Sequence, residues 1–308
     1  MWNMPVDTRF KKIEEFKTLM DSKEILKLEY AALKIRRNIL RLIKAGEAGH
    51  AGGALSAVEV VTALYFNLMK IDPGNPKWPQ RDRFVLSAGH KCLVLYAALA
   101  ERGFFDASIL DTYGALDSPV PGHPNMHKLP GIESNTGALG HGLSIAGGMA
   151  LGLRMDKSQS RVYVLMGDGE LAEGSNWEAA AAASMHKLDN ILVFVDRNRL
   201  QISGPTTDVM SYEPLDERWR SFGWSVRIID GHDFTAILRN AREIPFEKGK
   251  PSVIIADTIK SKGLSFAERK VNYHYWKATP EEMEQAERDL DSIEKGLKEK
   301  TERNTGNE

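Results

Sequence analysis

The stretch of sequence that decides the fold is RVYVLMGDGELAEGSNWEAAAAASMHKLDNILVFVDRNRLQISG, residues 161–204. It is typical of a buried strand, a tight glycine turn, an alanine-rich helix, a second buried strand and a polar loop. Asp168 follows the first strand and Asn198 follows the second. The carboxyl ends of parallel strands meet at one edge of an open α/β sheet, where ligands bind. We therefore expect these two side chains to lie close together in a ligand site.

The turn Gly167-Asp168-Gly169 is suited to a diphosphate group and a metal ion. Glycines let backbone N–H groups approach a phosphate, and the start of a helix adds a positive field. The Asp168 carboxylate, the Asn198 amide and the Leu200 carbonyl would be hard oxygen ligands for Mg²⁺ or Ca²⁺. Either side chain alone is better explained as a capping aspartate or a turn asparagine. The prediction depends on the pair.

The rest of the chain predicts an α/β fold with a mostly parallel sheet flanked by helices. Apolar runs at 83–87, 224–229 and 251–258 add strands to the two above, and helical patterns separate them. A helix at 143–153 is rich in glycine and alanine, which suits close packing under another element. Ser56, with Glu59 three residues later, predicts a capping box at the start of a helix.

The predicted domain organisation is one α/β domain between two charged ends. Residues 1–21 form a charged lead-in, and residues 22–278 form the domain. Residues 279–308 form a charged C-terminal helix and a tail that is disordered from residue 301. A long loop at 116–137 interrupts the domain, and loops of this length are often functional.

Composition excludes several classes of protein. The 308 residues are 42% hydrophobic and 27% charged, with a formal net charge of -1, so there is no basic footprint for nucleic acid. A single cysteine, Cys92, rules out an internal disulfide and suits a reducing compartment. We find no signal-peptide core and no apolar run of membrane-spanning length. We therefore expect a cytoplasmic protein that acts without nucleic acid or membrane.

Five motifs in order resemble those of the transketolase family. The Gly167-Asp-Gly turn followed by Asn198 resembles the thiamine diphosphate motif. The other four are Ala48-Gly-His-Ala-Gly52, Leu86-Ser-Ala-Gly-His-Lys91, Pro121-Gly-His-Pro124 and Thr136-Gly-Ala-Leu-Gly-His-Gly142. The resemblance covers residues 22–278 and implies the thiamine diphosphate-binding (PP-type) fold.

The resemblance also implies roles for the matching residues. Asp168, Asn198 and the Leu200 carbonyl would bind the metal ion. Thiamine diphosphate would be contacted by His90 and Gly169 at its diphosphate and by Leu139 near its rings, and Gly167 also belongs to its binding site. The sugar channel would contain the catalytic candidates His50, His123 and His274. In the family, an acid at the position of Glu173 contacts the neighbouring subunit. We assign only structural roles to His186, His232 and Cys92.

The sequence departs from the family pattern where the substrate is expected. Ala48 replaces a serine, and His141 stands where the family commonly has glutamine. The family's His-Gly appears here as His274-Tyr275. Pentose phosphate substrates therefore cannot be assumed, and sulfonated or branched sugars stay open.

The resemblance implies a split enzyme. A whole transketolase is about twice as long, and its second half holds the aminopyrimidine of the cofactor and supplies the activating glutamate. We therefore expect a C-terminal partner subunit, an α2β2 assembly, and transfer of a two-carbon ketol unit from a ketose to an aldose. The alternatives are another thiamine diphosphate half-chain, such as a synthase or a 2-oxo-acid dehydrogenase α subunit, or a non-catalytic scaffold subunit.

Overall fold

A computed structural model describes residues 22–305 of the chain. The predicted lead-in at 1–21 and the end of the predicted tail lie outside the described residues. Within the described part, five parallel strands form one sheet in the order β2-β3-β4-β6-β5. The strands are β2 (Arg83–Leu86), β3 (Val162–Gly167), β4 (Ile191–Arg197), β5 (Ser225–Asp230) and β6 (Ser252–Asp257).

Both faces of the sheet are buried, which explains why the central strands lack polar alternation. In β3, Tyr163 and Leu165 point into one apolar cluster, whereas Val164 and Met166 point into another. Successive side chains of a strand point to opposite faces, so a strand covered on both sides must be apolar throughout. The predicted α/β class with a parallel sheet is confirmed.

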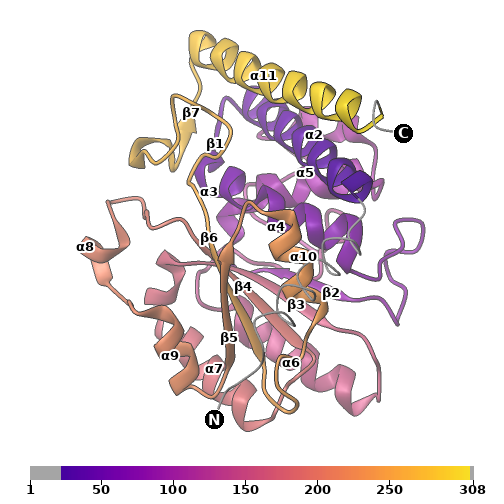
Figure 1. Cartoon of the computed structure of the whole chain (residues 1–308), viewed down its shortest axis with the longest axis vertical. Coiled ribbons are helices and arrows are strands. Elements are labelled where there is room, and N and C mark those ends of the chain that lie inside the picture. Colours follow the sequence, from indigo (N-terminus) through magenta and orange to yellow (C-terminus); the bar gives the residue numbers. More distant parts are fainter. Residues whose placement is uncertain (1–21, 306–308) are drawn as a thin grey trace.

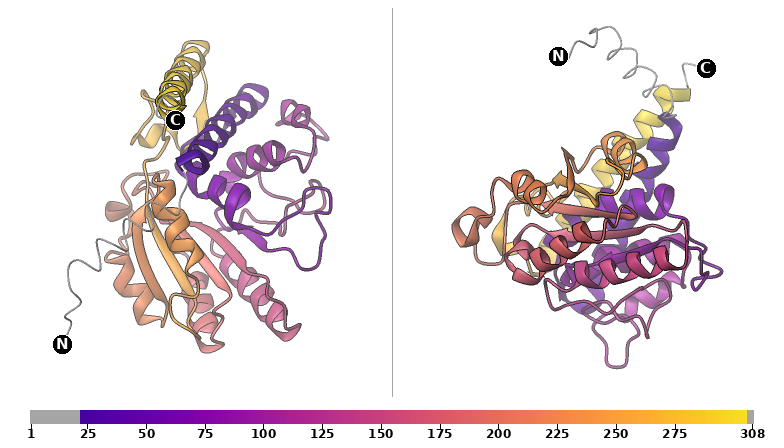
Figure 2. Two further views of the ribbon diagram at one scale, coloured as in Figure 1. Left: turned by 45° about the vertical axis from the view of Figure 1, so that its right-hand side comes forward. Right: turned by 90° about the horizontal axis from the view of Figure 1, so that it is seen from below.

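Helices cover the two faces of the sheet (Figures 1 and 2). One face carries α2 (Ser22–Gly46), α3 (Ala51–Ser56), α4 (Val58–Ala63), α5 (Cys92–Arg102) and α10 (Phe234–Arg242). The other face carries α6 (Gly142–Met155), α7 (Gly174–Met185) and α9 (Leu215–Ser221). A short helix, α8 (Thr206–Met210), follows the polar loop after β4. In the described part of the chain, no helix combines the length and apolar character that a membrane crossing needs.

A two-stranded ribbon and the last helix lie beside α2, at the top of Figure 1. The ribbon pairs β1 (Ala48–Gly49) antiparallel with β7 (Trp276–Lys277). The last helix, α11 (Pro280–Thr305), packs along α2 and buries Leu290 and Leu297. It continues to Thr305, so the prediction of disorder from residue 301 is wrong for 301–305. The division of the chain at residue 278 stays a prediction.

The predicted capping box at Ser56 and Glu59 is wrong. The α3 helix ends at Ser56 and α4 begins at Val58. The Ser56 hydroxyl donates to Asp196 (2.5 Å), and the Glu59 carboxylate pairs with Arg36 (2.6 Å). Both polar side chains are buried, so long-range partners satisfy them instead of a local helix end.

The glycine-rich face of α6 does not pack closely on another element of the described chain. Ala146 and Ala150 are buried, as expected for contact with the sheet. A Cβ atom added at Gly147, Gly148 or Gly152 would meet no atom within 4 Å. Gly147 and Gly148 line an open groove of about 340 Å³ between α6 and α7.

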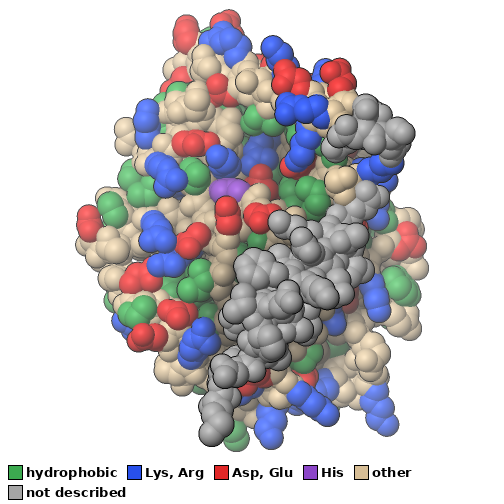
Figure 3. Space-filling model, in the orientation of Figure 1, with side chains coloured by type: hydrophobic (Ala, Val, Ile, Leu, Met, Phe, Trp, Pro, Cys, Tyr) green, Lys and Arg blue, Asp and Glu red, His purple; other side chains and the backbone are tan. Residues whose placement is uncertain are grey.

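Positive and negative side chains are interspersed over the molecular face drawn in Figure 3. This mixed surface agrees with the small formal net charge of -1. It differs from the clustered lysines and arginines of a nucleic-acid-binding face.

Candidate active site

Asp168 stands at the end of β3, beside the end of β4. Gly167 pairs with Asp196, and the Asp168 N–H donates to the Asp196 carbonyl (3.2 Å). The two oxygens of the Asp168 carboxylate accept from the Gly169 N–H (2.8 Å) and the Arg199 N–H (2.6 Å). Burial, aided by the Asp196 carboxylate, raises the pKa of Asp168 to about 6. The carboxylate is held in place at a site that favours a cation.

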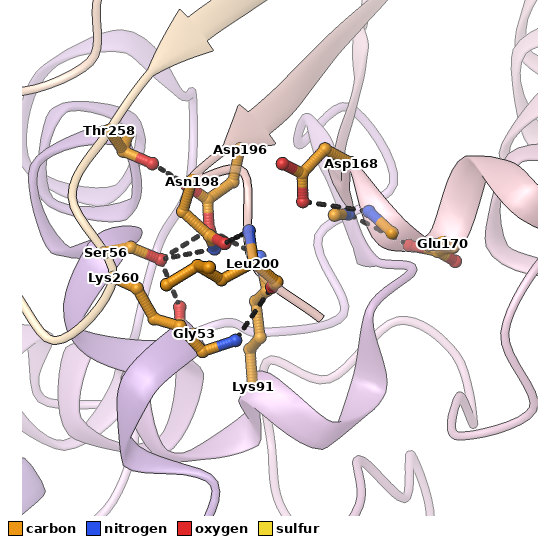
Figure 4. Close-up of polar contacts among 12 residues, drawn as sticks. Gly53, Ser56, Lys91, Asp168, Glu170, Asp196, Asn198, Leu200, Thr258 and Lys260 are labelled. Atoms are coloured by element: carbon orange, nitrogen blue, oxygen red, sulfur yellow. Dashed lines mark hydrogen bonds and ion pairs between the residues drawn. The ribbon is translucent and has the colours of Figure 1, made fainter. Parts of the chain in front are cut away.

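Asn198 lies on the loop after β4, and its amide is oriented by its neighbours (Figure 4). The amide nitrogen donates to the Asp196 carboxylate (3.2 Å) and lies 3.3 Å from the Ser56 hydroxyl oxygen. The amide oxygen accepts from the Leu200 N–H (3.2 Å). A carbonyl oxygen has two lone pairs, so this oxygen keeps one for a further ligand.

Asp168, Asp196 and Asn198, at the ends of β3 and β4, form what we call the floor of the site. Asp196 connects it to other elements, and sequence reasoning missed this residue. Its side chain is completely buried and accepts from the Lys91 ammonium (2.5 Å), the Ser56 hydroxyl (2.5 Å) and the Thr258 hydroxyl. Burial alone would raise the pKa of Asp196, but Lys91 and the two hydroxyls outweigh it and lower the pKa. Asp196 is therefore ionised and paired with Lys91. An aspartate at the end of an apolar strand was the available signal.

Lys260 links the Leu200 carbonyl to His274 and was also missed. Its ammonium donates to the Leu200 oxygen (2.9 Å) and lies 2.8 Å from Nδ1 of His274. Burial, with help from Lys91, lowers the pKa of Lys260 to about 8, so the group is mostly charged at neutral pH. An ammonium only donates, so Nδ1 of His274 accepts and the ring proton lies on Nε2. The contact therefore selects one tautomer of His274.

Glu170 organises the glycine turns around the site. Its carboxylate accepts from the Gly140 N–H (3.1 Å), the Gly167 N–H (3.1 Å) and the Ser87 hydroxyl (2.5 Å). Gly140 has a positive φ of 86°, and a Cβ there would lie 2.5 Å from the side chain of Glu173. The loop that carries Leu139 thus packs tightly against residues 170–175, which directly follow the Gly-Asp-Gly turn. The sequence offered no sign that an acid at a helix start would be buried.

Four histidines come together above this floor. His50 is the centre, and its ring centroid lies 5.3 Å from that of His90, 5.6 Å from His274 and 6.3 Å from His123. Burial is the main cause that lowers the pKa of His50, of His90 to about 2 and of His274 to about 3. These three rings are therefore neutral at physiological pH, and each carries one donor and one acceptor nitrogen. In His274 the acceptor nitrogen is already bound by Lys260, so only the donor is left.

A cavity of about 280 Å³ contains most of the predicted site residues. Every predicted residue except His123 lines it. His123 is exposed. It joins the histidine cluster by lying beside His50 and Gly137. The lining residues beyond the predicted set are Gly53, Lys91, Gly137, Glu170, Gln201, Ile202 and Lys260. His127, in the same loop, and His141 are exposed and do not line the cavity.

Most of this chain matches the thiamine diphosphate-binding domain of transketolase, with residues 29–292 covered by the family model. The chain belongs to the transketolase family. The predicted family and the predicted thiamine diphosphate-binding fold are confirmed.

Among curated relatives, single subunits of transketolases match over nearly their whole length. The chain is 46% identical to an apulose-4-phosphate transketolase subunit of Phocaeicola vulgatus, covering 88% of this chain and 97% of that protein. It is also 46% identical to a 6-deoxy-6-sulfo-D-fructose transketolase subunit of a Clostridium species, covering 84% of this chain and 94% of that protein. Human transketolase is 38% identical over 82% of this chain, but the match spans only 40% of the human protein.

Solved transketolase structures share the fold. A transketolase from Pichia stipitis superposes with a TM-score of 0.80 at 31% identity, covering 85% of this chain and 40% of that one. Transketolase from Campylobacter jejuni gives the same TM-score and identity, with 86% and 42% covered. The chain is thus a transketolase component that corresponds to the diphosphate-binding part of longer enzymes.

Proposed function

We propose that the chain is the diphosphate-binding subunit of a two-chain transketolase that moves a two-carbon ketol unit from a ketose to an aldose. The observation that carries this proposal is the meeting of Asp168, Asn198 and Leu200 with His50, His90 and His274 around one cavity. The family membership supports it. When bound, thiamine diphosphate supplies the electron sink for breaking and forming the carbon–carbon bond.

The metal site would use Asp168, Asn198 and the Leu200 carbonyl to hold Mg²⁺ or Ca²⁺. The donor set is one carboxylate, one amide and one carbonyl oxygen, which suits a hard cation. Within the described residues, no group of three or more His, Cys, Asp or Glu side chains could hold a metal alone. The ion would therefore need oxygens from the diphosphate and water to complete its shell.

The histidines and the glycine turns would bind the organic groups. His90 and Gly169 would contact the diphosphate, Gly167 would let it approach the backbone, and Leu139 would pack near the cofactor rings. The rings of His50 and His123 would hydrogen-bond sugar hydroxyls.

His274 would donate from Nε2 into the cavity, because Lys260 occupies its Nδ1. Its catalytic role therefore does not need a charged imidazole, which agrees with its low pKa of about 3.

The partner would be a C-terminal transketolase subunit that supplies the aminopyrimidine site, in an α2β2 assembly. Cavity-lining carboxylates of this chain have other tasks, because Asp168 faces the metal site and Glu170 is bound by Ser87, Gly140 and Gly167. The open groove between α6 and α7, with Glu178 in its wall, supports contact with another chain. The names of the two curated relatives, each a subunit, add further support. We expect this assembly to work in the cytoplasm.

For the donor sugar we propose a class of ketoses and no single compound. The relatives' names mention apulose 4-phosphate and 6-deoxy-6-sulfo-D-fructose, so a branched or sulfonated ketose is a candidate beside ordinary ketose phosphates. A suitable ketose panel contains one pentulose phosphate, one hexulose phosphate, apulose 4-phosphate and 6-deoxy-6-sulfo-D-fructose.

The test is reconstitution with the product of a neighbouring reading frame that resembles the second half of transketolase. Ketol transfer from the ketose panel is measured with this chain alone, with the partner alone and with both, in thiamine diphosphate and Mg²⁺. We expect turnover only with both chains. Turnover by the isolated chain would contradict the shared site, and no turnover from the complex with any donor would contradict the activity.

A further inference from the structure

The His50 ring is surrounded by more than the other histidines. The ring of Tyr275 lies closer to it than any of them, with centroids 4.8 Å apart and planes at 73°. His90 and His274 are half-buried on the inner side, whereas Tyr275 and His123 are exposed. We call these five rings the funnel: His50, His90 and His274 line the cavity, whereas the exposed Tyr275 and His123 do not and are called its rim.

The β1–β7 ribbon explains why Tyr275 faces His50. Its register pairs Ala48 with Lys277 and Gly49 with Trp276. Continuing this antiparallel register by one residue places Tyr275 opposite His50. Side chains directly opposite in such pairs lie within about 5 Å of each other, in agreement with the observed ring contact.

The ribbon is anchored, so the position of Tyr275 does not depend on a mobile loop tip. Trp276 is 3% exposed and packs in the main core, and its indole N–H donates to Glu282 (2.8 Å). The neighbouring Tyr273 hydroxyl also donates to Glu282 (2.8 Å). Tyr275 itself is 45% exposed, and among the described residues none hydrogen-bonds its hydroxyl. The anchored ribbon thus positions Tyr275 against His50, and its hydroxyl is not held by another described residue.

The chemistry of the funnel suits hydroxyl groups better than charges. The lysines that line the cavity are Lys91 and Lys260, and both ammonium groups are already engaged, by Asp196 and by Leu200 with His274. A neutral imidazole or a phenol can donate and accept, as a sugar hydroxyl does, and an aromatic ring packs on the C–H groups of a sugar.

We propose that Tyr275 is a specificity-determining residue that, with His50, contacts the hydroxylated carbon chain of the sugar. This inference rests on the proposed ketol transfer. The ribbon holds the ring at the rim, where it would contact the part of a ketose that lies beyond the two transferred carbons. A donor without that chain would not reach Tyr275.

The experiment compares two donors in the reconstituted complex. One is the best ketose of the panel, and the other is 3-hydroxypyruvate, which delivers the same two-carbon unit without a sugar chain. In Tyr275→Gly we expect kcat/KM for the ketose to fall about tenfold, mainly through KM, with 3-hydroxypyruvate unchanged within about twofold. Tyr275→Phe keeps the ring and should lose only about threefold with the ketose.

The matched control is Tyr30→Phe, which removes a tyrosine hydroxyl that bonds Thr301 and does not line the cavity, and which should leave the ratio of the two donors unchanged. An equal loss with both donors, or no loss with either, would overturn the role of Tyr275. If the wild-type complex processes 3-hydroxypyruvate but no ketose of the panel, the role of Tyr275 is overturned as well, since no sugar chain is then recognised. If the wild-type complex processes neither donor, the proposed function fails instead.

Discussion

The floor and the rim of the cavity are built in different ways. The floor consists of strand-end residues such as Asp168, Asp196 and Asn198, which are buried and connected by hydrogen bonds. The rim consists of His123 and Tyr275, which are exposed and held through a loop and a two-residue ribbon. We expect residues at the floor to be constrained both by folding and by the proposed cofactor contacts. Residues at the rim are free to vary with the substrate, which the following predictions test.

The largest effect is expected at the floor, for Lys91→Met. This change removes the ammonium from the buried Asp196 and leaves a carboxylate without its counter-charge. Loss of one partner of a buried ion pair costs about 3–5 kcal/mol in the free energy of unfolding. Urea unfolding of the metal-free protein measures it. Lys298→Met removes an exposed pair with Glu294 and should leave the free energy of unfolding nearly unchanged, because water screens that pair. Equal costs would show that the floor is no more tightly built than the surface.

The buried ion pair of Arg36 and Glu59 lies away from the cavity and gives a second measure of what a buried pair contributes to the free energy of unfolding. Burial alone would raise the pKa of Glu59, but Arg36 and His232 outweigh it and lower the pKa to about 2 from 4.5. Because the folded pKa is the lower one, the stabilisation is present above pH 4.5 and is lost as the pH falls toward 2. The loss amounts to about 3 kcal/mol.

Unfolding of the wild type and of Glu59→Gln between about pH 7 and 3 checks this sign. The difference in stability between the two proteins should shrink as the pH falls. A difference that does not change with pH would contradict the lowered pKa of Glu59 in the folded protein.

The next effect concerns Asn198, which we propose as a metal ligand. Asn198→Ala removes the amide oxygen from the proposed metal site, and we expect the affinity for Mg²⁺ with thiamine diphosphate to fall about 100-fold. Calorimetric titration of the complex measures it. Asn240→Ala, on α10 and bonded to Arg227, serves as the control and should bind normally. Normal binding by Asn198→Ala would favour a scaffold subunit.

The smallest effect is expected at the rim, for His123→Ala. His123 is exposed and contacts the cluster only through His50 and Gly137, so the fold should not need it. We expect kcat/KM for the ketose to fall about tenfold, with the affinity for thiamine diphosphate unchanged. Steady-state kinetics and cofactor titration check both parts. A loss of cofactor affinity would place His123 at the floor.

Much of the fold was predictable because its signals are local. The runs Val162–Gly167 and 191–195 are apolar without alternation, which is typical of strands buried on both faces. Helical patterns separate these strands, and strands of one sheet that are joined by a helix run parallel. The meeting of Asp168 and Asn198 followed from that topology alone.

Other features were not predictable because they join residues far apart in the sequence. The β1–β7 ribbon pairs two-residue strands that have no periodicity, and it alone places Tyr275 against His50. The capping-box prediction was wrong because Ser56 and Glu59 found partners in Asp196 and Arg36. A sequence pattern cannot show which distant group will satisfy a buried polar side chain.

The sequence by itself determined the sheet, the family and the strand-end position of the residues proposed to bind the metal and the diphosphate. These depend on apolar runs, glycine turns and short motifs, whose physical effect acts within a few residues. Only the tertiary structure decided which charges are buried together, as with Lys91 and Asp196, and which tautomer Lys260 selects in His274. Those choices depend on desolvation and on partners from distant segments, which exist only once the chain has folded.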